Sequence, residues 1–222
     1  MLFPYKDDNP TYSFPWVTIA IILANIGVFV WQMLSPLSDL AIVSRYGAIP
    51  YALLSFDKVQ PISPLASVFT SMFMHGGIFH LLGNMLYLWI FGDNLEDAFG
   101  HFRFLLFYLF AGAFAVYGHA VSDPESLIPL VGASGAISGV LGAYLLLFPR
   151  ARVSTIVFFG LFWVIQLPAV VVIGMWAVVQ FMNGAASAVA QHGGGVAWFA
   201  HIGGFVFGLM TVKFWLPARF RK

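Results

Sequence analysis

Long apolar runs, separated by short polar segments, dominate this sequence. An α-helix needs about 20 apolar residues to cross the roughly 30 Å hydrocarbon core of a bilayer. Six runs approach that length, at residues 14–34, 77–91, 102–121, 134–148, 167–182 and 196–215. The second and fourth runs are short, so we expect neighbouring helices to cover them. The pattern predicts an all-α, polytopic membrane protein folded as a bundle of six transmembrane helices.

The stretch from residue 153 to residue 182 allows two interpretations. It is mostly apolar but contains Pro168, so it is either one span with an interfacial lead-in or two short spans. The basic residues favour the first, because six spans leave only Arg45 and Lys58 on the outer side. The cytoplasmic side then carries the other eight: Lys6, Arg103, Arg150, Arg152, Lys213, Arg219, Arg221 and Lys222. This excess obeys the positive-inside rule and places both termini in the cytoplasm.

The segment between the first two runs, residues 35–76, mixes apolar residues with prolines, serines and charged side chains. It is too interrupted to span the membrane and too apolar to be freely solvated, so we expect a first loop that is partly embedded in the interface. The sequence contains no repeat and no soluble domain. We therefore expect a short cytoplasmic segment at 1–13, a membrane domain at 14–216 and a basic cytoplasmic tail at 217–222.

Composition narrows the classes of function. Of the 222 residues, 60% are hydrophobic and 9% are charged, and the net charge is +1, so no nucleic-acid partner is expected. Cysteine is absent, which excludes disulfides and thiol nucleophiles. All nine acidic residues fall in loops or at the ends of runs. This distribution argues against a proton-coupled or cation-coupled transporter, because such proteins usually keep a carboxylate within the membrane.

Few strongly polar side chains remain in or beside the apolar runs. They are His75, His80, Asn84, His119, Gln180, Asn183 and His201, together with several hydroxyl groups. His80 and Asn84 lie four residues apart in HGGIFHLLGNM, so they project from one face of the second span. Either they bond to neighbouring helices or they line a water-filled cavity, because an unpaired amide in hydrocarbon costs several kcal/mol.

A serine stands between two glycines at the start of the fourth run, in VGASGAISG. Gly135, Ser138 and Gly139 are small residues at helical spacing, which is typical of close helix packing. Packing alone does not require a serine at position 134. Gly132 and Gly135 flank Ser134, leave the local backbone uncrowded and allow a substrate to approach its amides.

A matching pattern occurs in the sixth run, in WFAHIGGFVFG. Gly204 and Gly208 form a second face of small residues just beyond His201. If the two glycine faces pack together, Ser134 and His201 come within hydrogen-bond reach at a similar depth from the outer side. A serine activated by a histidine base is a nucleophile for acyl transfer.

Acyl transfer also requires donors for the oxyanion, and losing one typically costs about 10² to 10³ in rate. His80, Asn84 and the backbone N–H of Ser134 are the candidates. No carboxylate reaches the depth of His201, so the sequence predicts a Ser–His dyad. His201 is then oriented by packing or by a neutral hydrogen bond rather than by a triad acid.

These residues resemble the rhomboid intramembrane serine proteases of the minimal six-span type. Three motifs occur in the family's order on the expected spans: HGGIFHLLGNM at 75–85, GASG at 132–135 and AHIGG, followed by a glycine, at 200–208. The resemblance implies that Ser134 is the nucleophile and His201 its general base, and that His80 and Asn84 belong to the oxyanion site.

The resemblance extends to supporting positions. Gly92, Glu96 and Gly100 match a family GxxxExxxG pattern, which implies a structural role. His75 matches a family histidine near the active-site cavity, with an implied role in shape and water retention.

Two positions depart from common family residues. Many members carry Trp-Arg in the first loop where this chain has Ala66 and Ser67, so its loop anchoring is expected to differ. Some members place a tyrosine against the base where this chain has Ser138. Trp198, Phe199 or Phe205 could instead supply an aromatic face for His201.

The sequence therefore predicts a serine endopeptidase that cleaves single-span membrane proteins within or beside their transmembrane segment, without metal or cofactor. We expect a prokaryotic cytoplasmic membrane, with the active site opening to the outer face in keeping with the depth of Ser134. Two alternatives remain: a catalytically inactive rhomboid-like protein that binds membrane clients, and a small transporter lined by His80, Asn84 and His201. Retention of both Ser134 and His201 argues against the inactive form.

Overall fold

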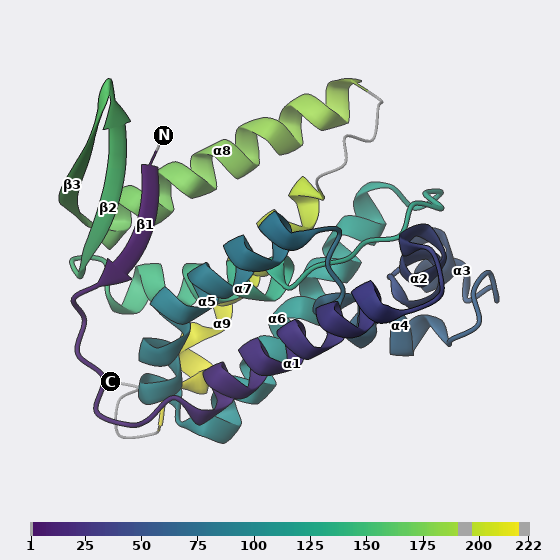
Figure 1. The fold of residues 1–222 in the computed structure, drawn as a ribbon, viewed down its shortest axis with the longest axis horizontal. Helices are drawn as coiled ribbons and strands as arrows, with labels where there is room; N and C mark the ends of the chain where they lie inside the picture. Colours follow the sequence, from purple (N-terminus) through teal and green to yellow (C-terminus); the bar gives the residue numbers. More distant parts are fainter. Residues whose placement is uncertain (1, 191–196, 218–222) are drawn as a thin grey trace.

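The computed structural model describes residues 2–190 and 197–217 (Figure 1). Within these residues the chain is mostly helical. The long helices are α1 Trp16–Leu34, α5 Ile78–Phe99, α6 His101–Ser122, α7 Ser134–Leu147, α8 Ala169–Ala190 and α9 Trp198–Trp215. Each coincides with one of the apolar runs. Residue 196, with which the sixth run begins, and all but the first residue of the expected basic tail lie outside the described residues.

Length and composition identify fewer clear spans than the predicted six. Among the described helices, α1, α6 and residues 169–188 of α8 are long and apolar enough to cross a membrane. A fourth candidate is the pair Pro64–Phe73 and Ile78–Phe99, whose helices meet at 84°. Helix α7 is shorter, with 14 residues, whereas α5 has 22 and is not the short helix that was expected. The fold is a membrane helix bundle, and the count of six spans remains a prediction.

The first loop folds into short helices that pack on one end of the bundle. They are α2 Asp39–Tyr46, α3 Pro50–Ser55, α4 Pro64–Thr70 and the 3₁₀ turn η1 Ser71–Phe73. Ala48, Leu53 and Val68 pack there against Val116 and Ala120 of α6. The loop is therefore a compact cap on the bundle, and its backbone also reaches the segment that leads into α7.

A three-stranded antiparallel sheet lies at the opposite end, and its presence shows that the prediction of an all-α fold was wrong. Strand β1 Leu2–Asp7 pairs with β2 Arg152–Phe159, and β2 pairs with β3 Leu161–Pro168. Gly160 makes the β2–β3 turn with a φ of +73°, a conformation that glycine adopts readily. Strand β3 then runs directly into α8 (Figure 1).

The hairpin explains the ambiguous stretch at 153–182. It is one helix preceded by a lead-in, as the charge distribution indicated, but the lead-in is extended rather than helical. An apolar run without strict alternation does not distinguish a strand from a buried helix. The partner strand, moreover, comes from the distant residues 2–7, which sequence periodicity cannot reveal.

Helix α7 is the central helix, buried between α6 and α9, and glycine makes its close crossings possible. A Cβ on Gly204 would overlap the carbonyl oxygen of Gly135, and one on Gly208 would overlap that of Gly139. The same part of α7 also meets α6, where a Cβ on Gly139 would lie 2.6 Å from the Cβ of Ala111. The predicted packing of the two glycine faces is therefore observed, backbone against backbone.

Glu96 joins α1 to α5 at the sheet end of the bundle. Its carboxylate is fully buried and accepts hydrogen bonds from the backbone N–H groups of Val17 and Thr18, at 2.8 and 2.7 Å, and from the Thr18 hydroxyl at 2.7 Å. A carboxylate at a helix N-terminus satisfies donors that lack partners within the helix. Gly100, with a φ of +81°, then turns the chain from α5 into α6.

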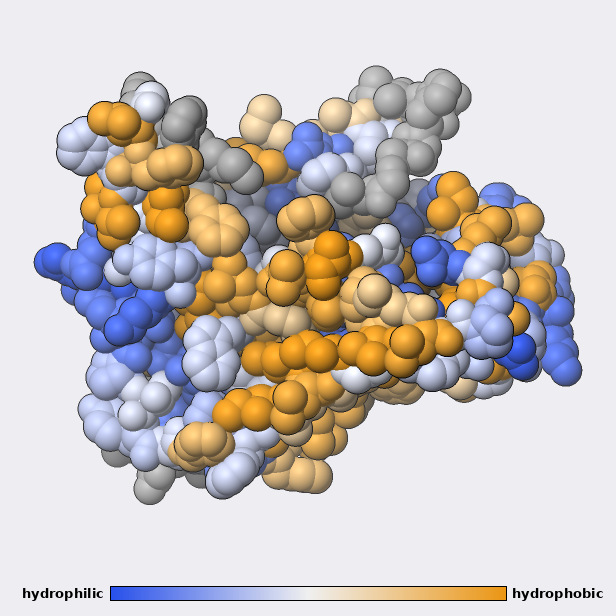
Figure 2. Space-filling view, in the orientation of Figure 1, coloured by the Kyte–Doolittle hydropathy of each residue, from blue (hydrophilic) through white to orange (hydrophobic). Residues whose placement is uncertain are grey.

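Apolar residues cover the middle of the bundle and much of the sheet at the upper left, and polar residues gather at the left and right edges of the view (Figure 2). Exposed residues of α1, including Leu23, Ile26, Val30 and Met33, contribute to the apolar part. The sheet end carries Lys6 and Arg152, and the first-loop end carries Asp39 and Lys58. This distribution is that of a bundle whose middle faces lipid.

The sheet is tied to α7 by one side-chain contact. The Tyr144 hydroxyl donates to the Asp7 carboxylate at 2.5 Å, and the Tyr144 side chain is fully buried. Burial raises the pKa of Asp7 above its usual value of 3.8, and the hydrogen bond from Tyr144 opposes that shift without cancelling it. The folded protein therefore favours the protonated carboxyl more than the unfolded chain does.

We predict that Gly204→Ala lowers the free energy of unfolding by about 1–3 kcal/mol, because the added methyl group overpacks a backbone crossing. The measurement is thermal unfolding of purified protein in detergent. Gly174→Ala on α8 is the matched control, since nothing lies within 4 Å of its added Cβ, and its Tm should be unchanged or slightly higher. Equal losses in the two variants would contradict the close α7–α9 crossing.

We predict that Asp7→Asn reduces the pH dependence of stability. In the parent, the contribution of Asp7 is fully present below pH 3.8 and is lost as pH rises through the raised folded pKa. The asparagine keeps an acceptor for Tyr144 and carries no charge, so the variant should gain stability relative to the parent over that interval. Unfolding at a series of pH values measures the difference. A difference between variant and parent that stays constant across the pH series would disprove the prediction.

Candidate active site

Ser134 is the first residue of α7. Backbone hydrogen bonds from the first loop hold the segment that precedes it. The backbone N–H of Gly132 donates to the carbonyl oxygen of Ser71 at 2.9 Å, and Ala48 and Leu130 exchange two backbone hydrogen bonds of 2.9 and 2.8 Å. Gly132 has a φ of +126°, a conformation that strongly favours glycine. These contacts therefore fix the position and orientation of the backbone that leads into Ser134.

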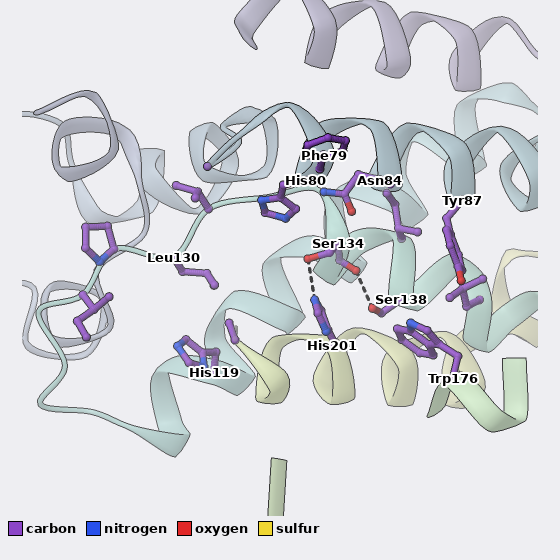
Figure 3. A pocket seen from close by; sticks show the side chains of 18 of the residues that line it. Phe79, His80, Asn84, Tyr87, His119, Leu130, Ser134, Ser138, Trp176 and His201 are labelled. Carbon is purple, nitrogen blue, oxygen red and sulfur yellow. Dashed lines mark hydrogen bonds between the residues drawn. The ribbon is translucent and has the colours of Figure 1, made fainter. Parts of the chain in front are cut away.

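His201 lies opposite Ser134, near the start of α9. Its Nε2 atom is 2.8 Å from the Ser134 Oγ atom, across the helix crossing made by the glycines (Figure 3). The Ser138 hydroxyl, one turn further along α7, donates to the backbone oxygen of Ser134 at 2.6 Å. The Ser138 hydroxyl therefore bonds within its own helix. The two residues chosen from the sequence as nucleophile and base are within hydrogen-bond distance.

Two tryptophans and a glutamine surround the rest of the imidazole. Trp198 meets the His201 ring edge-on, with centroids 6.2 Å apart, and Trp176 of α8 lies 6.1 Å away, tilted by 41°. Gln180 of α8 places its Oε1 atom 2.8 Å from His201 Nδ1. Of the three expected aromatic neighbours, Trp198 has a ring contact with His201, whereas Phe205 packs on Trp176 instead.

His80 and Asn84 approach Ser134 from α5 (Figure 3). A Cβ on Gly132 would lie 2.8 Å from Cε1 and 2.9 Å from Nε2 of the His80 ring, so the ring rests against the Gly132 backbone. Asn84 is only 7% exposed, and its Nδ2 group has no hydrogen-bond partner among the described residues. A buried amide donor without a partner is unusual, and the residue that carries it lines the cavity beside the serine.

These side chains line a cavity of about 680 Å³. Its walls come from α5, α6, α7, α8, α9 and the segment between α6 and α7, and they include Phe79, Tyr87, His119, Leu130 and Trp176. The lining residues Asp123 and Ser126 precede α7 at the first-loop end, so the cavity lies toward that end of the bundle. Its volume is that of an ordinary small-molecule or peptide site.

The remaining candidate residues lie around this site in supporting positions. His75 is buried outside the cavity lining. Its backbone N–H and carbonyl groups both bond to the Gln32 side chain at 3.1 Å, and its ring meets that of His80 with centroids 5.1 Å apart. Gly135, Gly204 and Gly208 form the helix crossing, and Glu96 lies at the far end of α5.

The sequence did not predict that Gln180 and Trp176 contact His201. Both lie on α8, which the chain reaches only after the sheet, and neither falls within a motif. An amide within an otherwise apolar helix was the one available signal, because such a group must find a partner inside the bundle. Which partner it finds depends on how α8 packs against α9.

Comparison with known proteins places these features in one family. The family model for the Rhomboid domain matches residues 63–218, a range that contains α4 to α9 and every residue of the Ser134 site described above. Rhomboid protein 1, mitochondrial, of Saccharomyces cerevisiae is 33% identical over 165 residues, which is 72% of this chain and 44% of that protein. RHOMBOID-like protein 1 of Arabidopsis thaliana is 30% identical over 155 residues, covering 60% of this chain and 39% of the relative.

A relative from Bacillus subtilis, Rhomboid protease GluP, is 30% identical over 141 residues, which is 64% of this chain and 25% of that protein. The matched regions therefore span less than half of each of these three relatives. Since they include a mitochondrial protein as well as a bacterial one, similarity does not support the expectation of a prokaryotic cytoplasmic membrane. The apolar helices, the glycine crossing and the match over residues 63–218 together show that this membrane protein belongs to the rhomboid family.

Proposed function

We propose that this protein is an intramembrane serine endopeptidase that cleaves single-span membrane proteins within or beside their transmembrane segment. The 2.8 Å contact between Ser134 Oγ and His201 Nε2, on the wall of a large cavity, carries the proposal. Membership of a family that includes a protein named as a protease supports it. Neither the client-binding nor the transporter alternative requires that contact.

In this mechanism the Ser134 oxygen attacks the carbonyl carbon of the scissile peptide bond while His201 Nε2 takes the hydroxyl proton. The C–N bond then breaks, and the leaving amine takes that proton from His201. The product is an acyl-enzyme on Ser134. Water, deprotonated by His201, hydrolyses the ester, releases the new carboxyl terminus and restores the serine.

Three donors on this chain are available to the oxyanion. The backbone N–H of Ser134 is free of an intrahelical partner because Ser134 begins α7. The Asn84 Nδ2 group is buried and unpartnered among the described residues, and the His80 ring rests against Gly132 beside the serine. Donors held in place before the reaction stabilise charge as it develops in the transition state.

The proposal includes an orientation in the membrane. We propose that α1, α5, α6, α7, α8 and α9 are six spans of a membrane domain at 14–216, with residues 1–13 and 217–222 cytoplasmic. The sheet end of the bundle carries Lys6, Arg150 and Arg152, which supports its assignment to the cytoplasmic side. The cavity then opens toward the outer face, and the lipid bilayer supplies single-span proteins as substrates.

We predict that Ser134→Ala and His201→Ala each reduce cleavage of a single-span reporter in liposomes by about 10³-fold or more, because each removes a member of one catalytic unit. The measurement is appearance of the cleaved fragment. Ser122→Ala is the matched control, since its hydroxyl donates to the backbone of its own helix at His119.

Each result discriminates between functions. Cleavage that survives Ser134→Ala would disprove the nucleophile assignment. Absence of cleavage by the folded parent, combined with solute flux that Ser134→Ala does not alter, would favour a transporter instead. Binding of the reporter without cleavage by any variant would indicate an inactive client-binding protein.

We predict that Asn84→Ala lowers kcat by about 10² to 10³ and leaves KM nearly unchanged, because an oxyanion donor acts mainly in the transition state. Steady-state cleavage in the same liposomes separates the two constants. Asn94→Ala removes an amide from the other end of α5, where Asn94 bonds to the backbone of Asn9, and should leave kcat unchanged. A rise in KM at constant kcat would instead assign Asn84 to substrate binding.

A further inference from the structure

The base of the proposed dyad has a neutral side-chain partner. Across the described residues, which include all nine acidic side chains, the hydrogen bonds of the His201 ring go to Ser134 and to Gln180. Since imidazole can carry its proton on either nitrogen, a base needs a partner that selects one tautomer and one ring orientation. We propose that Gln180 is the positioning residue of this site, holding His201 in the tautomer that can accept the serine proton.

The direction of each hydrogen bond follows from the carbonyl oxygen of Trp176, which lies at one end of the series Ser134, His201, Gln180. The Nε2 atom of Gln180 lies 3.4 Å from the carbonyl oxygen of Trp176. A carbonyl oxygen only accepts, so the NH₂ end of the amide must face it. The other end, Oε1, therefore faces His201 Nδ1 at 2.8 Å.

This assignment determines the protonation of the imidazole. An amide oxygen only accepts hydrogen bonds, so His201 Nδ1 must carry the proton. The lone pair of Nε2 is then directed at Ser134, whose hydroxyl donates across 2.8 Å. Each group in this series therefore donates a hydrogen bond to the next: Ser134 to His201, His201 to Gln180, and Gln180 to the backbone of α8. This is the arrangement that a general base requires.

Packing makes the orientation rigid. Gln180 is 7% exposed, and the Trp176 ring lies one turn earlier on the same helix, between His201 and Phe205. The Trp198 ring also contacts the imidazole, at 88° to its plane. Because small misplacements of catalytic groups can cost about 10²-fold in rate, a ring held by two indoles and one hydrogen bond is suited to catalysis.

A neutral partner also suits the surroundings. An ionised carboxylate at this depth would carry a large desolvation penalty, whereas an amide carries a smaller one and still directs a partial negative charge at Nδ1. The positioning group, the base and the nucleophile come from α8, α9 and α7 respectively. The hydrogen bond therefore makes the orientation of the base depend on the placement of α8.

The inference rests on the proposed serine-protease function, and its kinetic test uses paired substitutions. Gln180→Met keeps the length of the side chain but removes the strong acceptor, and should lower kcat for the single-span reporter by about 10²-fold at constant KM. Gln180→Glu restores an oxygen acceptor in either ionisation state and should recover most of the activity. Asn183→Leu, which removes another amide from the same helix, should behave as the parent.

A second measurement does not depend on activity. In protein labelled with ¹⁵N-histidine, the nitrogen shifts report which ring nitrogen is protonated, and the His201 signals are those missing from His201→Ala. The parent should show the Nδ1–H tautomer, and Gln180→Met should shift the population toward a mixture. If the folded parent neither cleaves nor binds covalent inhibitor, the proposed function fails, while the tautomer result still decides the inference.

Two results would overturn the role of Gln180. One is an Nε2–H tautomer in the parent, or a tautomer population that Gln180→Met leaves unchanged. The other is equal loss of kcat in Gln180→Met and Gln180→Glu with equal thermal stability, which would show that the residue acts through packing alone.

Discussion

The backbones of α7 and α9 touch because glycine occupies both sides of their crossing, and the arrangement of the proposed site depends on this contact. Any Cβ on Gly204 or Gly208 would enter the carbonyl groups of α7, so larger residues would separate the helices. Ser134 and His201 stand at the same end of that crossing. A shift of an ångström between the helices would break the 2.8 Å contact between them. In hydrocarbon, where no hydrophobic force draws helices together, close packing of small residues is the main source of such precision.

The polar contacts of Ser134, His201 and Gln180 near the crossing involve no acidic side chain among the described residues. The contacts from Ser134 to His201, Gln180 and the backbone of α8 involve a hydroxyl, an imidazole and an amide. The buried carboxylate of Glu96 lies far along α5, where the start of α1 supplies donors for it. The charge of Glu96 thus lies where a helix terminus can satisfy it, and the contacts around His201 are hydrogen bonds between dipoles, whose effect is strong where the dielectric constant is low.

Helix α8 connects the two ends of the molecule. Its first residues are held at the sheet end, where Ala169 and Val170 donate to the carbonyl oxygens of Ala151 and Pro149 at 2.8 and 3.0 Å. Further along, Trp176 and Gln180 reach the imidazole. The sheet is in turn joined to α7 through Tyr144 and Asp7. The helix that carries Gln180 is therefore anchored to the helix that carries Ser134.

The sequence by itself determined the long helices, because crossing hydrocarbon requires long apolar segments, and it determined Ser134 and His201 as candidates, because few polar groups occur beside those segments. It did not determine the sheet, since strand β2 requires a partner from residues 2–7 and apolar strands resemble apolar helices in sequence. It marked Gln180 as polar but assigned it no partner. Only the tertiary structure decided that α8 brings this amide to His201, because contacts between helices depend on their rotation and depth, which periodicity along one chain does not specify.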